Sequence, residues 1–216
     1  TSDMPWGSMS KGETTRSRIL DRAMQLASRD GLDGLTIGSL SEELALSKSG
    51  LFAHFGSKEA LQLAVLEHTR GRFAAHLEPY LRGITKGLPM LLAFVQAWLD
   101  WVAASDLPAG CPLLGATFEL ETREGPARDY LLKVHSDSRL RLTSMIQDAV
   151  DAGQLDRDLD VAQLIFELRG IVLAFHEALH VIRSSQARSR ANRAIAALME
   201  RHAPAAPARP VRGKAR

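Results

Sequence analysis

The amino-acid sequence predicts an all-α fold. Almost every segment with a regular apolar spacing has the helical one, and we find no alternating strand pattern, no internal repeat and no strand–helix–strand unit. The 216 residues are 45% hydrophobic and 24% charged, which is ordinary for a globular chain of one large or two small domains. The sequence therefore predicts a helical protein with a sizeable core.

The first helix is expected over residues about 13–30. Its inward positions follow an i, i+4, i+7, i+8 spacing: Ile19, Ala23, Leu26 and Ala27. Gly31 is expected to end this helix, because glycine is common just after a helix C-terminus.

The second helix is expected to be short and to end at Leu44. Thr36 and Ser39 are both suitable N-caps, since their hydroxyl oxygens can accept a hydrogen bond from a free backbone N–H. The Ser39-x-x-Glu42 spacing fits a capping box, but the pattern leaves the choice between the two starts open.

A minimal turn at residues 45–47 joins the second helix to a third, which Ser47 can cap and which ends near residues 55–56. Two short helices joined in this way predict a helix-turn-helix with its second helix presented outward. The expected inward residues are Leu40, Leu44, Leu46, Leu51 and Phe55. The expected outward residues are Lys48, Ser49, Gly50, Phe52 and His54.

Longer helices are expected in the rest of the chain. Ser57 can cap the first of them, with Leu61, Val65 and His68 on its inner side. The others are expected over residues about 88–102, 112–119, 126–153, 161–182 and 188–202. Asp160 can cap the helix over 161–182, and Ile182 is expected on the inward face of that helix. The helix over 88–102 carries apolar residues on two faces, which indicates burial on two sides.

The two ends of the chain are expected to lie outside the fold. Residues 1–12 are expected to be flexible, and Gly7-Ser8-Met9 is typical of a cloning junction, so residues 1–8 would precede a native start at Met9. The Pro/Ala-rich segment 203–216 is expected to be a disordered basic tail. Because this tail and Arg201 hold five basic residues and no acid, the net charge of +2 says little about the folded body.

The helix-turn-helix segment resembles a known family. The matching residues are Thr36-Ile37, Leu40, Leu46-Ser47-Lys48, Gly50-Leu51-Phe52, His54-Phe55 and Gly56-Ser57-Lys58-Glu59-x-Leu61. With this spacing, residues about 14–62 resemble the DNA-binding domain of the tetracycline-repressor (TetR) family. The remainder agrees with the family only in being all-helical and of suitable length.

The resemblance implies a homodimer with a DNA-binding domain over residues 13–57 and a helical effector-binding and dimerisation domain over 58–202. Phosphate contacts are then expected from Thr36, Ser47, Phe52, His54 and Lys58. Base-edge contacts are expected from Lys48, Ser49 and Gly50, and Arg16 and Arg18 are expected to reach a flanking groove.

The segment also departs from the family pattern. Ala45 replaces the usual turn glycine, which indicates either a turn without positive φ or mild strain. Ser41 replaces a packed alanine and is expected to hydrogen-bond within its own helix. Phe52 replaces the common tyrosine, so one hydroxyl that could meet a phosphate is absent.

Eight side chains in the second domain are candidates for an effector cavity: Phe94, Trp98, Trp101, Cys111, Phe118, Phe166, Phe175 and His176. Each alone is more often a plain core residue, but the set favours a small and largely apolar effector. His176 and His180 lie one turn apart without a third ligand, so we expect no metal and no cofactor.

Cys111 is the single cysteine, which excludes an intrachain disulfide and favours a cytoplasmic location. Its place at a helix start before Pro112 could lower the pKa of the thiol. A redox- or electrophile-sensing regulator is therefore an alternative, although a buried and inert cysteine is the commoner case.

The last two helices are expected to pair with those of a second copy. The expected interface residues are Leu168, Val172, Leu179, Ala191, Ile195 and Leu198. No apolar run is long enough for a membrane span, so no membrane partner is expected.

The predicted function is a DNA-binding transcriptional regulator, with double-stranded operator DNA and a small-molecule effector as partners. Repression of a palindromic operator, relieved by the effector, is favoured over activation. An α-helical enzyme is disfavoured because no nucleophile–base pair or carboxylate pair stands out. A structural protein with a vestigial helix-turn-helix is a third hypothesis.

Overall fold

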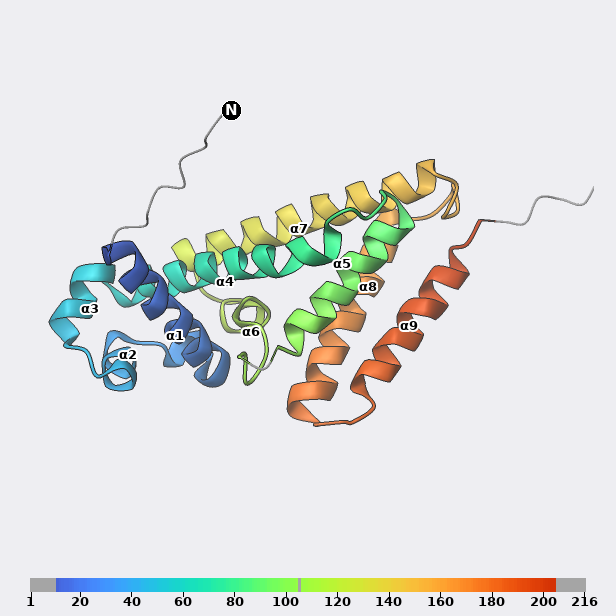
Figure 1. The fold of residues 1–216 in the computed structure, drawn as a ribbon. Coiled ribbons are helices and arrows are strands. Elements are labelled where there is room, and N and C mark those ends of the chain that lie inside the picture. Colours follow the sequence, from blue (N-terminus) through green and yellow to red (C-terminus); the bar gives the residue numbers. More distant parts are fainter. Residues whose placement is uncertain (1–10, 105, 205–216) are drawn as a thin grey trace, which may run out of the picture.

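The computed structural model describes residues 11–104 and 106–204, and every regular element in these ranges is helical, which confirms the all-α prediction. The first four helices are α1 (Lys11–Gly34), α2 (Ile37–Leu44), α3 (Lys48–Phe55) and α4 (Lys58–Leu81). Helices α1 to α3 lie at one end of an elongated molecule, and α4 leads away from them (Figure 1). The predictions for residues 1–12 and 203–216 fall almost wholly outside the described residues.

The other elements build the larger end of the molecule. They are α5 (Leu88–Val102), α6 (Pro112–Glu119), α7 (Pro126–Asp151), α8 (Val161–His176), the π-helical turn η1 (Glu177–Val181) and α9 (Ala187–Arg201). Helix α7 runs beside α4, and α8 and α9 form a pair at the far end, while the short α6 packs against α1 (Figure 1). Helix α6 thus joins the two ends of the molecule.

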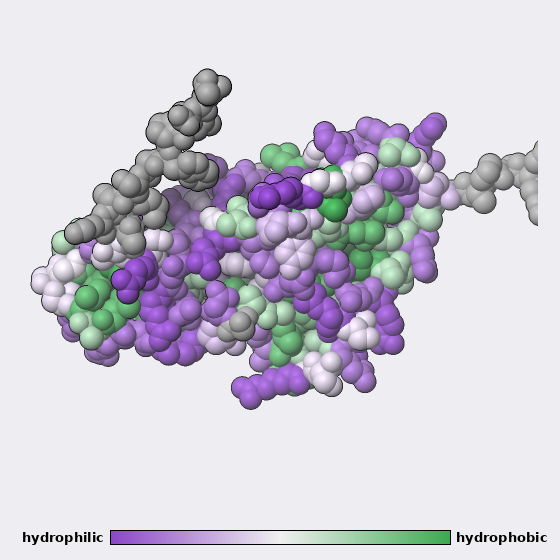
Figure 2. Space-filling model, viewed as in Figure 1, coloured by the Kyte–Doolittle hydropathy of each residue, from purple (hydrophilic) through white to green (hydrophobic). Residues whose placement is uncertain are grey.

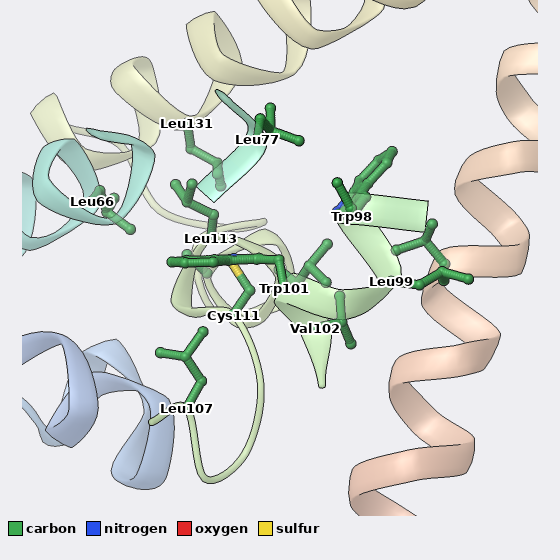
Figure 3. Packing of buried hydrophobic residues seen from close by; sticks show 14 of the residues in the cluster. Leu66, Leu77, Trp98, Leu99, Trp101, Val102, Leu107, Cys111, Leu113 and Leu131 are labelled. Atoms are coloured by element: carbon green, nitrogen blue, oxygen red, sulfur yellow. The ribbon is translucent and has the colours of Figure 1, made fainter. Parts of the chain in front are cut away.

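One cluster of buried apolar side chains continues from α1 to α9. In its middle the Trp101 ring lies beside the sulfur of Cys111, with Leu113 and Leu107 on either side (Figure 3). The boundary between the two expected domains is therefore bridged by a shared core, and its position at residue 57 stays a prediction.

The predicted caps at Ser47, Ser57 and Asp160 are confirmed, since each side chain accepts a hydrogen bond from the backbone N–H three residues ahead. The open choice for α2 is decided in favour of Thr36, which forms a reciprocal capping box with Ser39. The expected Ser39-x-x-Glu42 box is wrong because Ser39 is already inside the helix.

The helical conformation breaks at Gly31, as predicted: this residue adopts φ 78° and ψ 166°, and a further helical turn after the kink reaches Gly34. The helix that was expected over residues 161–182 ends earlier than predicted. The α-helix that begins after Asp160 ends at His176, and η1 follows. Ile182 is 64% exposed, so its expected inward position is wrong.

Every helix within residues 11–104 and 106–204 is too short or too polar to cross a membrane.

Candidate DNA-binding surface and effector cavity

The turn between α2 and α3 is tight and strained. Ala45 adopts φ 52° and ψ 37°, so the expectation of a turn without positive φ is wrong and that of mild strain holds. The Ser41 hydroxyl donates to the Leu46 carbonyl at 2.6 Å, and the Leu46 N–H donates to the Ser41 carbonyl at 3.1 Å. Ser41 therefore clamps the turn, instead of bonding within its own helix as expected.

Helix α3 is held to the body by its inner side. Leu51 and Phe55 are buried as predicted, and the Arg16 guanidinium lies 5.2 Å from the centre of the Phe55 ring. Leu46 is 43% exposed in the single chain, so its predicted burial is wrong. The left-handed residue before it takes the backbone out of helical geometry and turns this side chain outward.

The outer side of α3 is open to solvent. Lys48, Ser49, Gly50, Phe52 and His54 are all exposed, as the outward set predicts. Phe52 is 58% exposed, which excludes it from the core of this chain. Apolar and polar side chains gather together at this tip of the molecule (Figure 2). Contacts of these residues with DNA stay predictions.

The other candidate DNA contacts lie around this surface. Thr36 and Ser47 use their hydroxyl oxygens as helix caps, and Arg18 is exposed beside Leu44 and Leu46. Lys58 Nζ donates to the Asp33 carbonyl at 2.9 Å and lies 3.8 Å from the Asp33 carboxylate. The positive charge of Lys58 at the start of α4 thus already faces the carboxylate of Asp33, and a DNA phosphate would have to compete with Asp33 for Lys58.

The turn at Gly31 is the junction between the end of the molecule formed by α1 to α3 and the rest of the molecule. The Glu119 carboxylate of α6 accepts hydrogen bonds from the backbone N–H groups of Leu32 and Asp33, at 3.1 and 2.9 Å. Gln62 Nε2 of α4 donates to the Leu32 carbonyl at 2.7 Å. Sequence reasoning missed this junction, because Glu119 follows Leu32 by 87 positions.

Arg123 strengthens the same junction with an ion pair to Asp33. The hydrogen bond from Arg123 is the main cause that lowers the pKa of the Asp33 carboxyl, and the charge of Lys58 adds to it. Asp33 is therefore charged near neutral pH. Its carboxylate faces Lys58 at the start of α4 and Arg123 in the segment after α6, and so connects these two parts of the chain.

The loop before α6 is tied down by two histidines and a serine. Ser28 Oγ donates to the Gly110 carbonyl at 2.7 Å and accepts from the Ala109 N–H at 3.1 Å. His176 Nε2 lies 3.1 Å from the Ala109 carbonyl, and His180 Nε2 lies 2.8 Å from the Val102 carbonyl. His176 thus holds a loop instead of lining the expected cavity, and its burial lowers the pKa of its imidazole.

A cavity of about 380 Å³ lies among α4, α5, α6 and α7, and we call it the α4–α7 cavity. Its apolar lining comprises Phe73, Leu77, Phe94, Leu113 and Val134, together with Ala74. Its polar lining comprises Arg70, Asp137, Ser138 and Arg141. Trp98 and Trp101 lie behind this lining, with ring centres 6.0 Å from Phe94 and 5.6 Å from Phe73.

The eight side chains expected around one cavity are not brought together. Phe94 alone among them lines the α4–α7 cavity, while Cys111 and Phe175 are buried elsewhere in the core. Phe118 is 64% exposed and Phe166 is 73% exposed, so neither faces an enclosed space in this chain. Aromatic residues at helical spacing indicate which faces of a helix are buried. They do not indicate which of these buried faces line a cavity.

A second hollow, the α7–α8 groove, has a volume of about 680 Å³ and is lined by Leu132, Ile165 and Phe166 together with His135, Arg139 and Arg169. An Arg169 Nη atom lies 3.0 Å from His135 Nδ1. Burial lowers the pKa of Arg169 and of His135, and neighbouring arginines add to both effects. Arg139 and Arg169 therefore give the groove its positive charge, whereas the lowered pKa of His135 leaves this imidazole neutral near pH 7.

Cys111 does not have the properties of a sensor thiol. The residue is buried, and this burial raises the pKa of the thiol, which the Trp101 indole and the backbone N–H groups of α6 offset only in part. The expected lowering by the helix start is wrong because desolvation outweighs it. A thiolate is the reactive form, so a raised pKa argues against the redox alternative.

The residues expected at a dimer interface face inward instead. Leu168, Val172, Ala191, Ile195 and Leu198 are buried within the chain, so these predictions are wrong, and Leu179 is partly buried. The apolar stripe that they form packs α8 against α5 and α9. The outer side of α8 carries exposed Phe166 and Leu173 around Gly170, where an added Cβ would meet open space.

Among residues 11–104 and 106–204, no three histidine, cysteine or acidic side chains gather as a metal site would require.

An outward helix on a helix-turn-helix, carried by an all-α body, is the arrangement of a DNA-binding protein. Residues 19–65 match the family described as bacterial regulatory proteins, tetR family, and residues 87–195 match the tetracyclin repressor-like C-terminal domain. The chain belongs to the TetR family of transcriptional regulators, and its relatives are regulators and not enzymes.

Curated relatives and solved structures agree with this assignment. The chain is 28% identical over 158 residues to the HTH-type transcriptional repressor ComR of Escherichia coli, covering 73% of this chain and 75% of ComR. It is 26% identical over 173 residues to the E. coli regulator UidR, covering 78% and 84% of the two chains. A TetR regulator structure from Chloroflexus aurantiacus aligns with a TM-score of 0.73 at 23% identity, over 89% of this chain and 96% of that one.

Proposed function

We propose that this regulator is a homodimeric repressor that binds a palindromic operator and is released from it by a small molecule. The observation that carries the proposal is the outer face of α3, where Lys48 and His54 are exposed and make no ion pair or hydrogen bond within the described chain. A short helix with free polar side chains at both ends of its outer face, Lys48 in the first turn and His54 in the last, suits the major groove of DNA. The name of the relative ComR supports repression.

We place the effector in the α4–α7 cavity. Its volume of about 380 Å³ lies in the range of small-molecule sites, and most of its walls are apolar. Helix α4 lines the cavity and has its N-terminus beside α3, where Ser57 is its N-cap. An effector that prefers one position of α4 would shift the population of DNA-binding dimers by its difference in affinity for the two states.

We place the dimer contact on the outer side of α8. Phe166 and Leu173 are large exposed apolar residues there, and the exposed Gly170 between them permits a close approach of two helices. Burial of such a stripe stabilises a dimer by removing apolar surface from water. Two copies related in this way can present two α3 helices to two half-sites, and we expect the protein to act in the cytoplasm, where operators lie.

Selection of bound fragments from sheared genomic DNA tests this function. We expect the purified full-length chain to enrich fragments that share a palindrome, with half-site centres about 34–36 Å apart or a multiple of this spacing. Fragments enriched without a shared motif would contradict specific operator recognition.

A further inference from the structure

We infer that the effector is a small monoanion with an apolar, aromatic-sized body, and that Arg141 binds its acid group at the α4–α7 cavity. The inference rests on the proposed function, because it names the chemistry of the ligand for that site.

The walls of the cavity fix the body of the ligand. Phe73 and Phe94 meet edge to face with ring centres 6.4 Å apart, and Leu77 and Leu113 continue the apolar surface. Phe94 and Leu77 are each 2% exposed, so both are rigidly packed parts of the core. A volume of about 380 Å³ suits a molecule of two or three fused or linked rings, or an acyl chain of similar size.

The charges of the cavity do not balance within the protein. Arg70 and Asp137 form an ion pair at 2.7 Å, which leaves their sum close to zero. Arg141 is exposed and makes no ion pair in the described chain; its guanidinium lies 5.8 Å from the centre of the Phe94 ring. One positive charge is therefore left over where the cavity meets its apolar wall.

This leftover charge selects the sign of the ligand. A guanidinium offers a planar pair of N–H donors that match a carboxylate or sulfonate, and such charge-assisted bonds are stronger than neutral ones. A cationic ligand would be repelled by Arg141, while a neutral one would gain nothing from it. The nearby apolar wall lowers the local dielectric and strengthens the attraction of an anion.

The same placement gives the ligand a route to the DNA-binding end. The Arg70–Asp137 pair joins α4 to α7, and a bound acid group within the same cavity competes with Asp137 for Arg70. Loosening this pair frees α4 to shift relative to α7. The charge of the ligand then acts on the helix that leads to α3.

Two fluorescent probes with the same ring system test the inference. These are 8-anilinonaphthalene-1-sulfonate, a monoanion, and N-phenyl-1-naphthylamine, which lacks the sulfonate. Each is titrated into the full-length protein and into its Arg141→Gln variant. We expect the substitution to weaken binding of the anion about tenfold, and that of the neutral probe by less than about twofold.

Matched variants locate the effect. Lys133→Gln removes one positive charge from the exposed side of α7, the helix that also carries Arg141. Arg139→Gln removes one positive charge from the α7–α8 groove. Both are expected to keep the affinity for the anion, whereas Ala74→Phe, which fills the α4–α7 cavity, is expected to weaken both probes.

Three results would overturn the inference. Arg141→Gln could leave the anion unaffected, Arg139→Gln could instead abolish its binding and so assign the anion to the α7–α8 groove, or Ala74→Phe could change neither probe. The last result would also remove the proposed effector site. None of them bears on operator recognition, which the selection of genomic fragments tests separately.

Discussion

The outer face of α3 and the turn at Gly31 are both polar, but their hydrogen bonding is opposite. On α3, Lys48 and His54 have no polar partner within the described chain. At the turn, side chains from α4 and α6 bond the backbone groups of Leu32 and Asp33. Side chains without partners on α3 are available to an outside molecule, whereas the hydrogen bonds from α4 and α6 to the turn fix the geometry in which α3 is presented.

The largest effect is expected where the bonding at the turn is removed. Glu119→Ala deletes an acceptor of two backbone hydrogen bonds, and we expect it to lower the free energy of unfolding by about 2–3 kcal/mol. Urea unfolding followed by circular dichroism measures the change. Glu121→Ala, an exposed neighbour, is the control, and an equal loss in both variants would show that the turn is not specially held.

On the outer face of α3, a substitution is expected to affect DNA binding and not folding. His54→Ala should weaken operator binding by about 1 kcal/mol, roughly fivefold, through loss of one hydrogen bond to phosphate. His54→Gln, which keeps a donor, should restore part of the affinity. Equilibrium binding by fluorescence anisotropy measures both variants, and a loss of thermal stability in His54→Ala would place this residue in the fold instead.

The strained turn between the two regions offers a smaller effect of the opposite sign. Ala45→Gly relieves a left-handed alanine and is expected to raise the free energy of unfolding by about 0.5–1 kcal/mol, since the greater freedom of glycine in the unfolded chain offsets part of the gain. Chemical denaturation measures it. An unchanged or lower stability would mean that the turn tolerates alanine without strain.

The smallest effect concerns the residue at which this chain departs from its family. Phe52→Tyr adds a hydroxyl to a side chain that is 58% exposed, so folding should be unaffected. We expect operator affinity to rise about two- to threefold, which is at the low end for one added hydrogen bond. Competition between the two proteins for one operator detects such a difference, and equal affinity would indicate that the ring does not face a phosphate.

Sequence reasoning succeeded where structure is set locally. The caps at Ser47, Ser57 and Asp160 and the burial of Leu51 and Phe55 depend on residues within a few positions of each other. These features fixed the helix-turn-helix and its outward face. The choice between Thr36 and Ser39 needed the structure, because both hydroxyls take part in one capping box.

Features made by distant segments were not predictable. Glu119 accepts a hydrogen bond from Leu32, which lies 87 positions earlier in the chain, and no local sequence pattern indicates this contact. The apolar stripe of α8 was assigned to a partner subunit, yet Leu168 and Val172 pack inward, because a helical period marks a buried face without naming what covers it. The prediction of a lowered pKa for the Cys111 thiol was wrong for a similar reason. The sequence shows that this residue precedes a helix, but it does not show that the residue is buried.

The most direct test of the central claim is to repeat the selection of genomic fragments with Lys48→Ala and with Lys86→Ala. Lys48 begins α3, while Lys86 is exposed in the segment between α4 and α5. We expect Lys86→Ala to recover the wild-type palindrome, and Lys48→Ala to relax the base preference at one position of each half-site and weaken binding by about 1–3 kcal/mol. Recovery of the same palindrome with unchanged affinity by Lys48→Ala would contradict the assignment of α3 as the helix that reads DNA.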